Sequence, residues 1–149
     1  NHQTGRITPL HTRSITAMAG TFGYELNPET LTEAEKEEVR KQIRDFRKYE
    51  PLIRSGLYYR LTDPFRELPA AWEFLAEDAS EVLVSVVMQE MHGNMPVMYL
   101  RLKGLPEGCF YQEQQSGQIF ASDALMGGGI PLSDQFGDYA AFQFYFKKI

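Results

Sequence analysis

The 149-residue sequence has little cysteine, no excess of positive charge and no long hydrophobic run. Its single cysteine, Cys109, has no partner within the chain, which excludes an internal disulfide framework and suits a reducing compartment such as the cytoplasm. The formal net charge of −5 offers no basic face for phosphate groups, so a nucleic acid is not an expected partner. No segment approaches the ~18 uninterrupted apolar residues of a bilayer-spanning helix, so the sequence predicts no membrane span.

The composition is that of a globular protein, with 43% hydrophobic and 23% charged residues. The first part of the chain predicts a helix that begins with Thr8 as N-cap and Pro9 at its first position, and that stops at Gly20. A short apolar strand over 21–26 and a long charged helix follow. Helix, strand and helix form one slice of an α/β repeat, and one repeat cannot close a parallel sheet. We therefore expect this chain to be part of a larger protein.

The long helix has the clearest local signals. Thr32 and Glu35 have the spacing of a capping box, in which the side chain of each residue accepts a hydrogen bond from the backbone N–H of the other. Pro51 is expected to kink or restart the last turn, and Gly56 to end the helix. The apolar stripe that should dock on the rest of the protein consists of Val39, Ile43, Phe46 and Ile53. The opposite, charged face is expected to be solvated, and Glu37 is expected to pair with Lys41.

After residue 56 the hydrophobic period changes from helical to two, which predicts β-structure. Seven short strands separated by turn signals every ~8–12 residues are typical of an antiparallel β-sandwich. The strand over 81–89 is apolar on both faces and is expected to lie centrally in a sheet. The other strands are expected over 57–61, 71–75, 97–103, 109–112, 118–120 and 139–147, with Trp72 and Phe74 inward in the second and the turn at Ser116 and Gly117 forming a hairpin.

Several stretches carry a resemblance to a known family, namely Asn1–Arg6, Thr8–Leu10, Thr12–Arg13, Gly20–Leu26, Leu52–Gly56, Tyr59–Leu61, Leu100–Leu105 and Ser122–Met126. They resemble the C-terminal part of bacterial α-galactosidases of glycoside hydrolase family 36. It implies that 1–56 are the last helix–strand–helix segment of a (β/α)8 barrel and that 57–149 are the C-terminal antiparallel β-sandwich. It also implies a parent enzyme that hydrolyses terminal α-galactosides of the melibiose and raffinose type with retention, with the rest of the barrel as the partner of this chain.

A retaining glycosidase needs two carboxylates about 5–5.5 Å apart. The resemblance implies that this pair lies on earlier barrel strands, and no position here matches either motif. We therefore expect no catalytic residue in this chain and no activity from it alone. The candidates for substrate-adjacent residues are Glu25 and Tyr24, at the end of the expected barrel strand, and Asn1 and His2 in a loop that would approach the same face. The alternative is that Glu25 is a structural carboxylate and His2 a loop hydrogen-bonder.

No cofactor or metal is expected. His11 and His92 have no second ligand at metal spacing, and Gly127–Gly129 lacks the Lys-Ser/Thr of a phosphate-binding loop and is interpreted as a flexible turn. The cluster of Met88, Met91, Met95 and Met98 favours core filling or a subunit contact over a copper site.

Three functions remain open from the sequence: a non-catalytic part of an α-galactosidase, an independent carbohydrate-binding sandwich, and a pure assembly domain. Sugar-stacking faces for the second could come from Tyr58, Tyr59, Trp72, Tyr99 and Tyr111. Apolar residues of the first two helices and the strand between them would lack barrel partners, so we expect either a homo-oligomer or helices that fold back on the sandwich.

Overall fold

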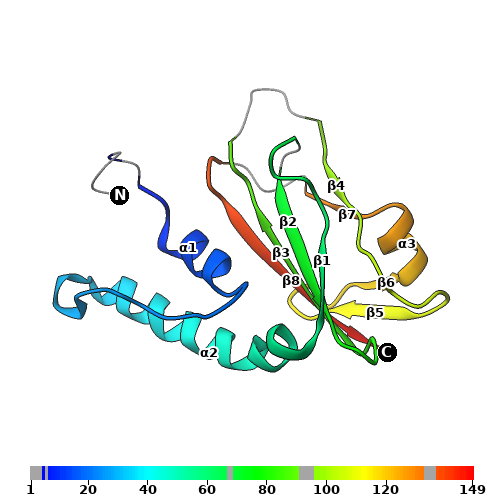
Figure 1. The fold of residues 1–149 in the computed structure, drawn as a ribbon, viewed down its shortest axis with the longest axis horizontal. Coiled ribbons are helices and arrows are strands. Elements are labelled where there is room, and N and C mark those ends of the chain that lie inside the picture. Colours follow the sequence, from blue (N-terminus) through cyan, green and yellow to red (C-terminus); the bar gives the residue numbers. More distant parts are fainter. Residues whose placement is uncertain (1–4, 6, 67–68, 91–95, 133–136) are drawn as a thin grey trace.

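In the computed structural model, residues 5, 7–66, 69–90, 96–132 and 137–149 are described. An antiparallel β-sheet forms the centre of the molecule, with α1 and α2 on one face and a smaller layer of β4, β7 and α3 on the other (Figure 1). The helices are α1 (Leu10–Ala17), the 3-10 helix η1 (Pro28–Thr30), α2 (Glu33–Ser55) and α3 (Ser122–Gly127). The strands are β1 (Leu57–Arg60), β2 (Ala70–Leu75), β3 (Glu81–Val87), β4 (Tyr99–Leu100), β5 (Phe110–Glu113), β6 (Ile119–Ala121), β7 (Ile130–Pro131) and β8 (Ala141–Lys148).

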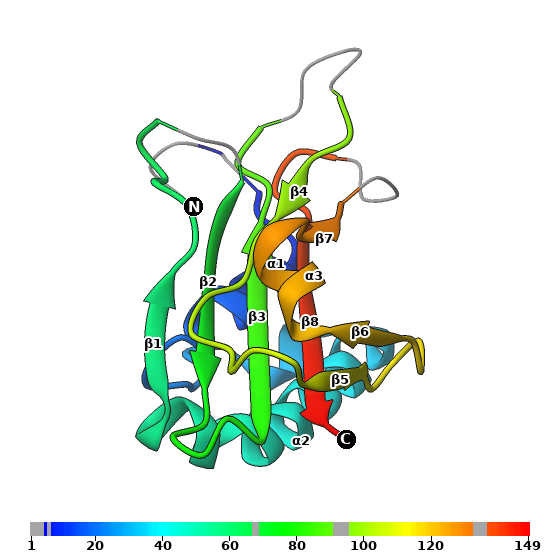
Figure 2. The same ribbon diagram turned by 90° about the vertical axis from the view of Figure 1, so that its right-hand side faces the viewer.

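The larger sheet has six strands in the order β1-β2-β3-β8-β5-β6, and β4 pairs with β7 in a two-stranded second sheet (Figure 2). All pairs are antiparallel, and β3 and β8 pair from Glu81↔Lys147 to Val87↔Ala141. The mainly β, antiparallel fold that follows a helical piece is therefore confirmed. The central position expected for residues 81–89 is confirmed too, since β3 lies between β2 and β8.

The two faces of the sheet bury different clusters. On the side of β4 and α3, Val82, Val84, Val86 and Phe146 are fully buried. On the side of α2, a smaller cluster joins Leu52 of that helix to sheet residues Phe74, Leu83 and Tyr145. Trp72 and Phe74 do point inward, but toward the helices rather than into the space between the two sheets.

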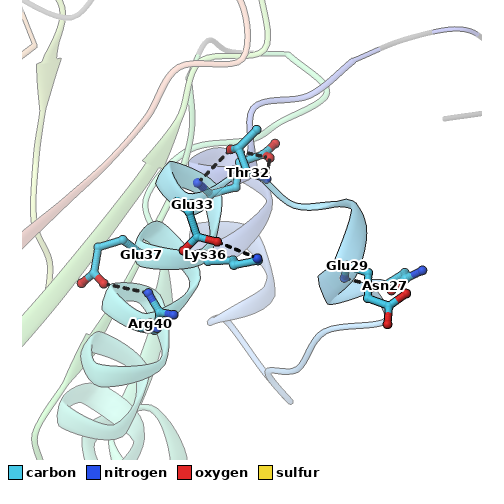
Figure 3. Close-up of polar contacts among 8 residues, drawn as sticks. Asn27, Glu29, Thr32, Glu33, Lys36, Glu37 and Arg40 are labelled. Atoms are coloured by element: carbon cyan, nitrogen blue, oxygen red, sulfur yellow. Dashed lines mark hydrogen bonds and ion pairs between the residues drawn. The ribbon is translucent and has the colours of Figure 1, made fainter.

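The start of α2 is fixed by the predicted capping box. The Thr32 hydroxyl accepts from the Glu35 N–H at 3.2 Å, and the Glu35 carboxylate accepts from the Thr32 N–H at 2.8 Å (Figure 3 shows this end of the helix). The helix continues through Pro51, with no second start, and Gly56 caps it as expected. The predicted pairing of Glu37 with Lys41 is wrong, because Glu37 binds Arg40 and Arg44 while Lys41 binds Asp45.

The first helix begins one residue later than expected. Pro9, not Thr8, is the N-cap of α1, and no side chain caps the helix. The chain leaves the helix at Met18, two residues before Gly20. The predicted strand over 21–26 is wrong for this chain, since these residues have no regular secondary structure. A strand requires a neighbour to complete its backbone hydrogen bonds, and no described strand pairs with this segment.

Most of the remaining strand predictions are confirmed within one or two residues. The exception is 97–103, of which only Tyr99–Leu100 is a strand, although Leu100 and Leu102 are buried and Tyr99 is exposed as the alternation predicted. The expected hairpin joins β5 to β6. The Gly127–Gly129 run is not a free turn: it ends α3, and Gly129, at a φ of 88°, lies so close to Leu100 that a Cβ would be 2.7 Å from its carbonyl oxygen.

Candidate functional site

Tyr24 and Glu25 lie in the extended segment between α1 and η1, and Tyr24 is attached to α2 by a hydrogen-bonded relay. Its hydroxyl donates to Oε1 of Gln42, and Nε2 of Gln42 donates to Oε1 of Glu38 at 2.8 Å. Gln42 is only 3% exposed, so this relay satisfies a buried amide. Burial raises the pKa of Tyr24, and the nearby carboxylate of Glu38 raises it further, against the opposing effect of Arg13. The phenol is therefore a neutral donor at physiological pH.

Aromatic packing holds the same segment in place. The ring of Phe22 stacks on Phe46 of α2 with 4.8 Å between centroids, and it meets the ring of Tyr24 edge-on at 5.2 Å. Phe46 belongs to the apolar stripe expected from the sequence, so this part of the stripe docks on the segment that contains Phe22. The segment is thus fixed by side chains although it lacks a strand partner.

A shallow cavity of 190 Å³ lies between this segment and α1. Its lining residues are Leu10, Arg13, Ser14, Ala17 and the run Phe22–Leu26. Among these described lining residues, Glu25 is the one carboxylate, with an exposed side chain, and Arg13 is the one cation. A carboxylate and a guanidinium can bind the hydroxyl groups of a polar ligand, but the double displacement of a retaining glycosidase needs a second carboxylate. The cavity can therefore take part in binding and cannot carry out hydrolysis by that route.

The remaining site predictions concern the N-terminal loop and metal ligands. Asn1 and His2 lie outside the described residues, as do His92, Met91 and Met95. Within the described ranges, no group of three or more His, Cys, Asp or Glu side chains is placed to hold a metal ion.

Two residues of the relay were not expected from the sequence. Gln42 interrupts the apolar face of α2 between Val39 and Ile43, and a polar residue at such a position was the available signal. Its partner Glu38 gave no signal beyond its place on the charged helix.

The aromatic residues considered for sugar stacking divide into two groups. Tyr111 is fully buried and Trp72 and Tyr59 are partly buried, whereas Tyr58 and Tyr99 are 52% and 63% exposed. Tyr58 lies on β1 at one edge of the large sheet, and Tyr99 lies on β4 in the other layer. These two rings do not share a face, so they do not form one stacking platform.

Comparison with known proteins connects these features to one family. The family model described as "Glycosyl hydrolase family 36 C-terminal domain" matches residues 69–146, which is more than half of the chain. The chain belongs to glycoside hydrolase family 36. A second model, described as "Melibiase", matches residues 1–56. The C-terminal match covers β2 to β7 and most of β8, while β1 lies outside both matched ranges.

Relatives in the family are much longer than this chain. The bifunctional alpha-galactosidase/sucrose kinase AgaSK of Mediterraneibacter gnavus is 49% identical over 149 residues, which are 100% of this chain and 16% of that protein. Alpha-galactosidase AgaA of Geobacillus stearothermophilus is 38% identical over the same length and is covered to 20%. The chain therefore spans about a fifth or less of the length of these relatives.

Solved structures of the family superpose on the whole chain. The galactosidase domain of AgaSK matches with a TM-score of 0.96 and the crystal structure of AgaA with 0.94, each covered to 21%. None of the helices in the described part of the chain is long and apolar enough to cross a membrane.

Proposed function

We propose that this chain is the non-catalytic C-terminal part of an α-galactosidase, and that the complete enzyme hydrolyses terminal α-galactosides of the melibiose and raffinose type with retention. The observation that carries the proposal is the match to two consecutive family regions, 1–56 and 69–146, within relatives of which the chain covers about a fifth. Those relatives are named as α-galactosidases, and a variant of AgaA was crystallised with raffinose. The single cysteine favours a reducing compartment such as the cytoplasm.

The two parts of the chain have separate roles in this proposal. Residues 1–56 are the end of the catalytic barrel, and 57–149 are a sandwich that supports it. The cluster of Leu52, Phe74, Leu83 and Tyr145 supports this division, because it joins the last barrel helix to the sheet through buried apolar contacts. Tyr49 adds to the junction, since its ring lies 5.1 Å from that of Tyr145. The sandwich would thus fix the position of the helix that carries the Gln42 relay and, through it, Tyr24.

The first experiment tests the absence of catalysis. The purified chain is incubated with a chromogenic α-galactoside, beside a heat-inactivated sample of the same preparation. We expect equal rates in the two samples, since the described residues that line the cavity of Glu25 include no second carboxylate. Turnover above the inactivated control would contradict the proposal.

The second experiment tests membership of an α-galactosidase directly. The corresponding C-terminal region of the Geobacillus enzyme is replaced by residues 1–149 of this chain, and the same enzyme ending before that region is the control. We expect the chimera to hydrolyse the chromogenic substrate and the shortened enzyme to be inactive. A chimera that folds, as judged by circular dichroism and gel filtration, and that remains inactive would count against the proposal.

Independent sugar binding is a second candidate, which the exposure of Tyr58 and Tyr99 favours. Calorimetric titration of the chain with galactose or raffinose separates it from the first. Saturable heat that disappears in Tyr58→Ala or Tyr99→Ala would support a binding module. The absence of binding heat would support a sandwich that only supports the barrel. We further propose a homo-oligomer for the parent, to be measured by sedimentation of the active chimera at several concentrations.

A further inference from the structure

Glu73 is an ionisable residue whose side chain lies inside the apolar core of the sandwich. It lies on β2, between register partners Tyr59 on β1 and Val84 on β3, and it is 0% exposed. Its Oε1 accepts the backbone N–H of Lys103 at 2.8 Å. Its Oε2 is buried with no hydrogen-bond partner among the described residues. One carboxyl oxygen is thus satisfied and the other is not.

The surroundings of Glu73 offset a negative charge on its carboxyl group only weakly. It shares its face of the sheet with buried Ala71 and Leu75, and Val84 of β3 contributes no polar group. Of the described titratable groups, Tyr59 of β1 is a register partner of Glu73, and Lys103 of the segment after β4 donates its backbone N–H to it. The ammonium group of Lys103 donates to the carbonyl oxygen of Arg60 at 2.8 Å and its side chain is exposed, so its charge lowers the pKa of Glu73 less than burial raises it.

An ionised carboxylate with one donor in an apolar core is costly, and such groups bind a proton instead. Burial raises the pKa of Glu73 to about 8, against the smaller opposing effects of the Lys103 N–H and the Lys103 charge. A protonated carboxyl group still accepts the Lys103 N–H through its carbonyl oxygen, and its O–H carries no net charge into the core. The hydrogen bond at 2.8 Å is therefore compatible with the neutral form.

The segment that this hydrogen bond holds belongs to the second layer of the sandwich. Leu102 and Leu105 on either side of Lys103 are 2% and 5% exposed, so the backbone between them is pressed against the sheet. Gly104 has a φ of 72°, and a Cβ there would be 2.6 Å from the hydroxyl oxygen of Tyr59. The Lys103 N–H in this tight passage has Glu73 as its partner.

We propose that Glu73 is a protonated latch between the six-stranded sheet and residues 101–105, and that ionisation of its carboxyl group loosens this segment. The latch is a pH-dependent device of the sandwich, and it does not depend on the parent enzyme's reaction.

The direction of the pH effect follows from the two titrations. The carboxyl group titrates near 4.5 in the unfolded chain and near 8 in the folded one. Its contribution to stability is therefore fully present below pH 4.5, is lost as the pH rises, and is exhausted above pH 8. Over most of that window the ratio of folded to unfolded chain should fall by about tenfold per pH unit from this group alone.

Urea unfolding of the chain and of Glu73→Gln between pH 5 and pH 8 measures this effect. The glutamine keeps the acceptor for Lys103 and cannot ionise. We expect the unfolding equilibrium of the unmodified chain, relative to that of the variant, to change by roughly a hundredfold or more across this range. Glu113→Gln is the matched control, because Glu113 is also buried but accepts two backbone N–H groups and should not reproduce the effect. Parallel profiles for the unmodified chain and Glu73→Gln would overturn the proposal.

A second measurement needs no variant. The amide signal of Lys103, followed by nuclear magnetic resonance in the unmodified chain, should shift with the ionisation of Glu73. A midpoint near pH 8 supports the latch. A midpoint below about 5, the range of an exposed glutamate, would show that the carboxyl group is ionised at neutral pH and would overturn it.

Discussion

Replacing Leu52 by alanine tests whether α2 is seated on the sheet as the structure describes. Leu52 is 7% exposed and packs among Phe74, Leu83 and Tyr145. Removing most of a buried leucine side chain loses roughly 100–130 Å² of apolar contact, or about 3 kcal/mol at ~25 cal/mol per Å². This value lies within the ~2–5 kcal/mol range of leucine-to-alanine changes in cores, where incomplete collapse of the cavity adds to the cost. We therefore expect Leu52→Ala to lower the free energy of unfolding by about 3 kcal/mol.

The assay is urea unfolding followed by circular dichroism and by the fluorescence of the single tryptophan. Trp72 packs against the same cluster as Leu52, so its emission reports on the junction between helix and sheet. The matched control is Leu57→Ala on β1, five positions along the chain, where the leucine is 46% exposed. We expect a loss of about 1 kcal/mol or less there. Equal losses in the two variants would refute the described seating of α2.

Three further predictions concern single side chains. Gly129→Ala should cost about 2 kcal/mol in urea unfolding, because the added Cβ would lie 2.7 Å from the carbonyl oxygen of Leu100, while Gly127→Ala, with nothing within 4 Å, should be close to neutral. Thr32→Ala should cost about 1 kcal/mol through loss of the α2 cap, and hydrogen exchange should show this loss at the first turn of the helix. Glu113→Gln should cost about 2 kcal/mol at pH 7, and the difference should shrink as the pH falls below 4.5.

The sign for Glu113 is opposite to that for Glu73. Burial acts to raise the pKa of Glu113, but the hydroxyl and N–H of Ser116 and the N–H of Gln115 lower it below its usual value. A carboxylate of that kind stabilises the fold above its unfolded pKa and loses this contribution in acid. Two buried glutamates of the six-stranded sheet are thus expected to respond to pH in opposite directions. This account would be contradicted if the difference in free energy of unfolding between Glu113→Gln and the unmodified chain were the same at pH 7 and at pH 3.

Features set by neighbouring residues were predictable from the sequence. The start of α2 depends on Thr32 and Glu35, which are three residues apart, and both hydrogen bonds of the capping box are present. The run over 81–89, apolar on both faces, predicted the central place of β3 for the same reason, since it is read from neighbouring residues. The resemblance to family 36 was readable because it spans nearly the whole chain.

Features that depend on distant partners were not predictable. Residues 21–26 have the composition of a strand, but strand structure needs a hydrogen-bonded neighbour, and the described sheets do not supply one. Helix α3 is only six residues long, and its place is set by contacts such as the Leu102 N–H with the carbonyl of Leu125. The lack of a hydrogen-bond partner for Oε2 of Glu73 among the described residues depends on the register of β1, β2 and β3, which the sequence does not show.

The place of β8 in the sheet has a consequence for synthesis of the protein. This strand follows the other described strands in sequence, yet it lies between β3 and β5 and joins the β1-β2-β3 half to the β5-β6 half. While a ribosome is still making the chain, the two halves cannot join until residues 141–148 have left the exit tunnel. Until then the edge of β3 that pairs with β8 lacks its hydrogen-bonded neighbour, so the six-stranded sheet stays incomplete until β8 is available.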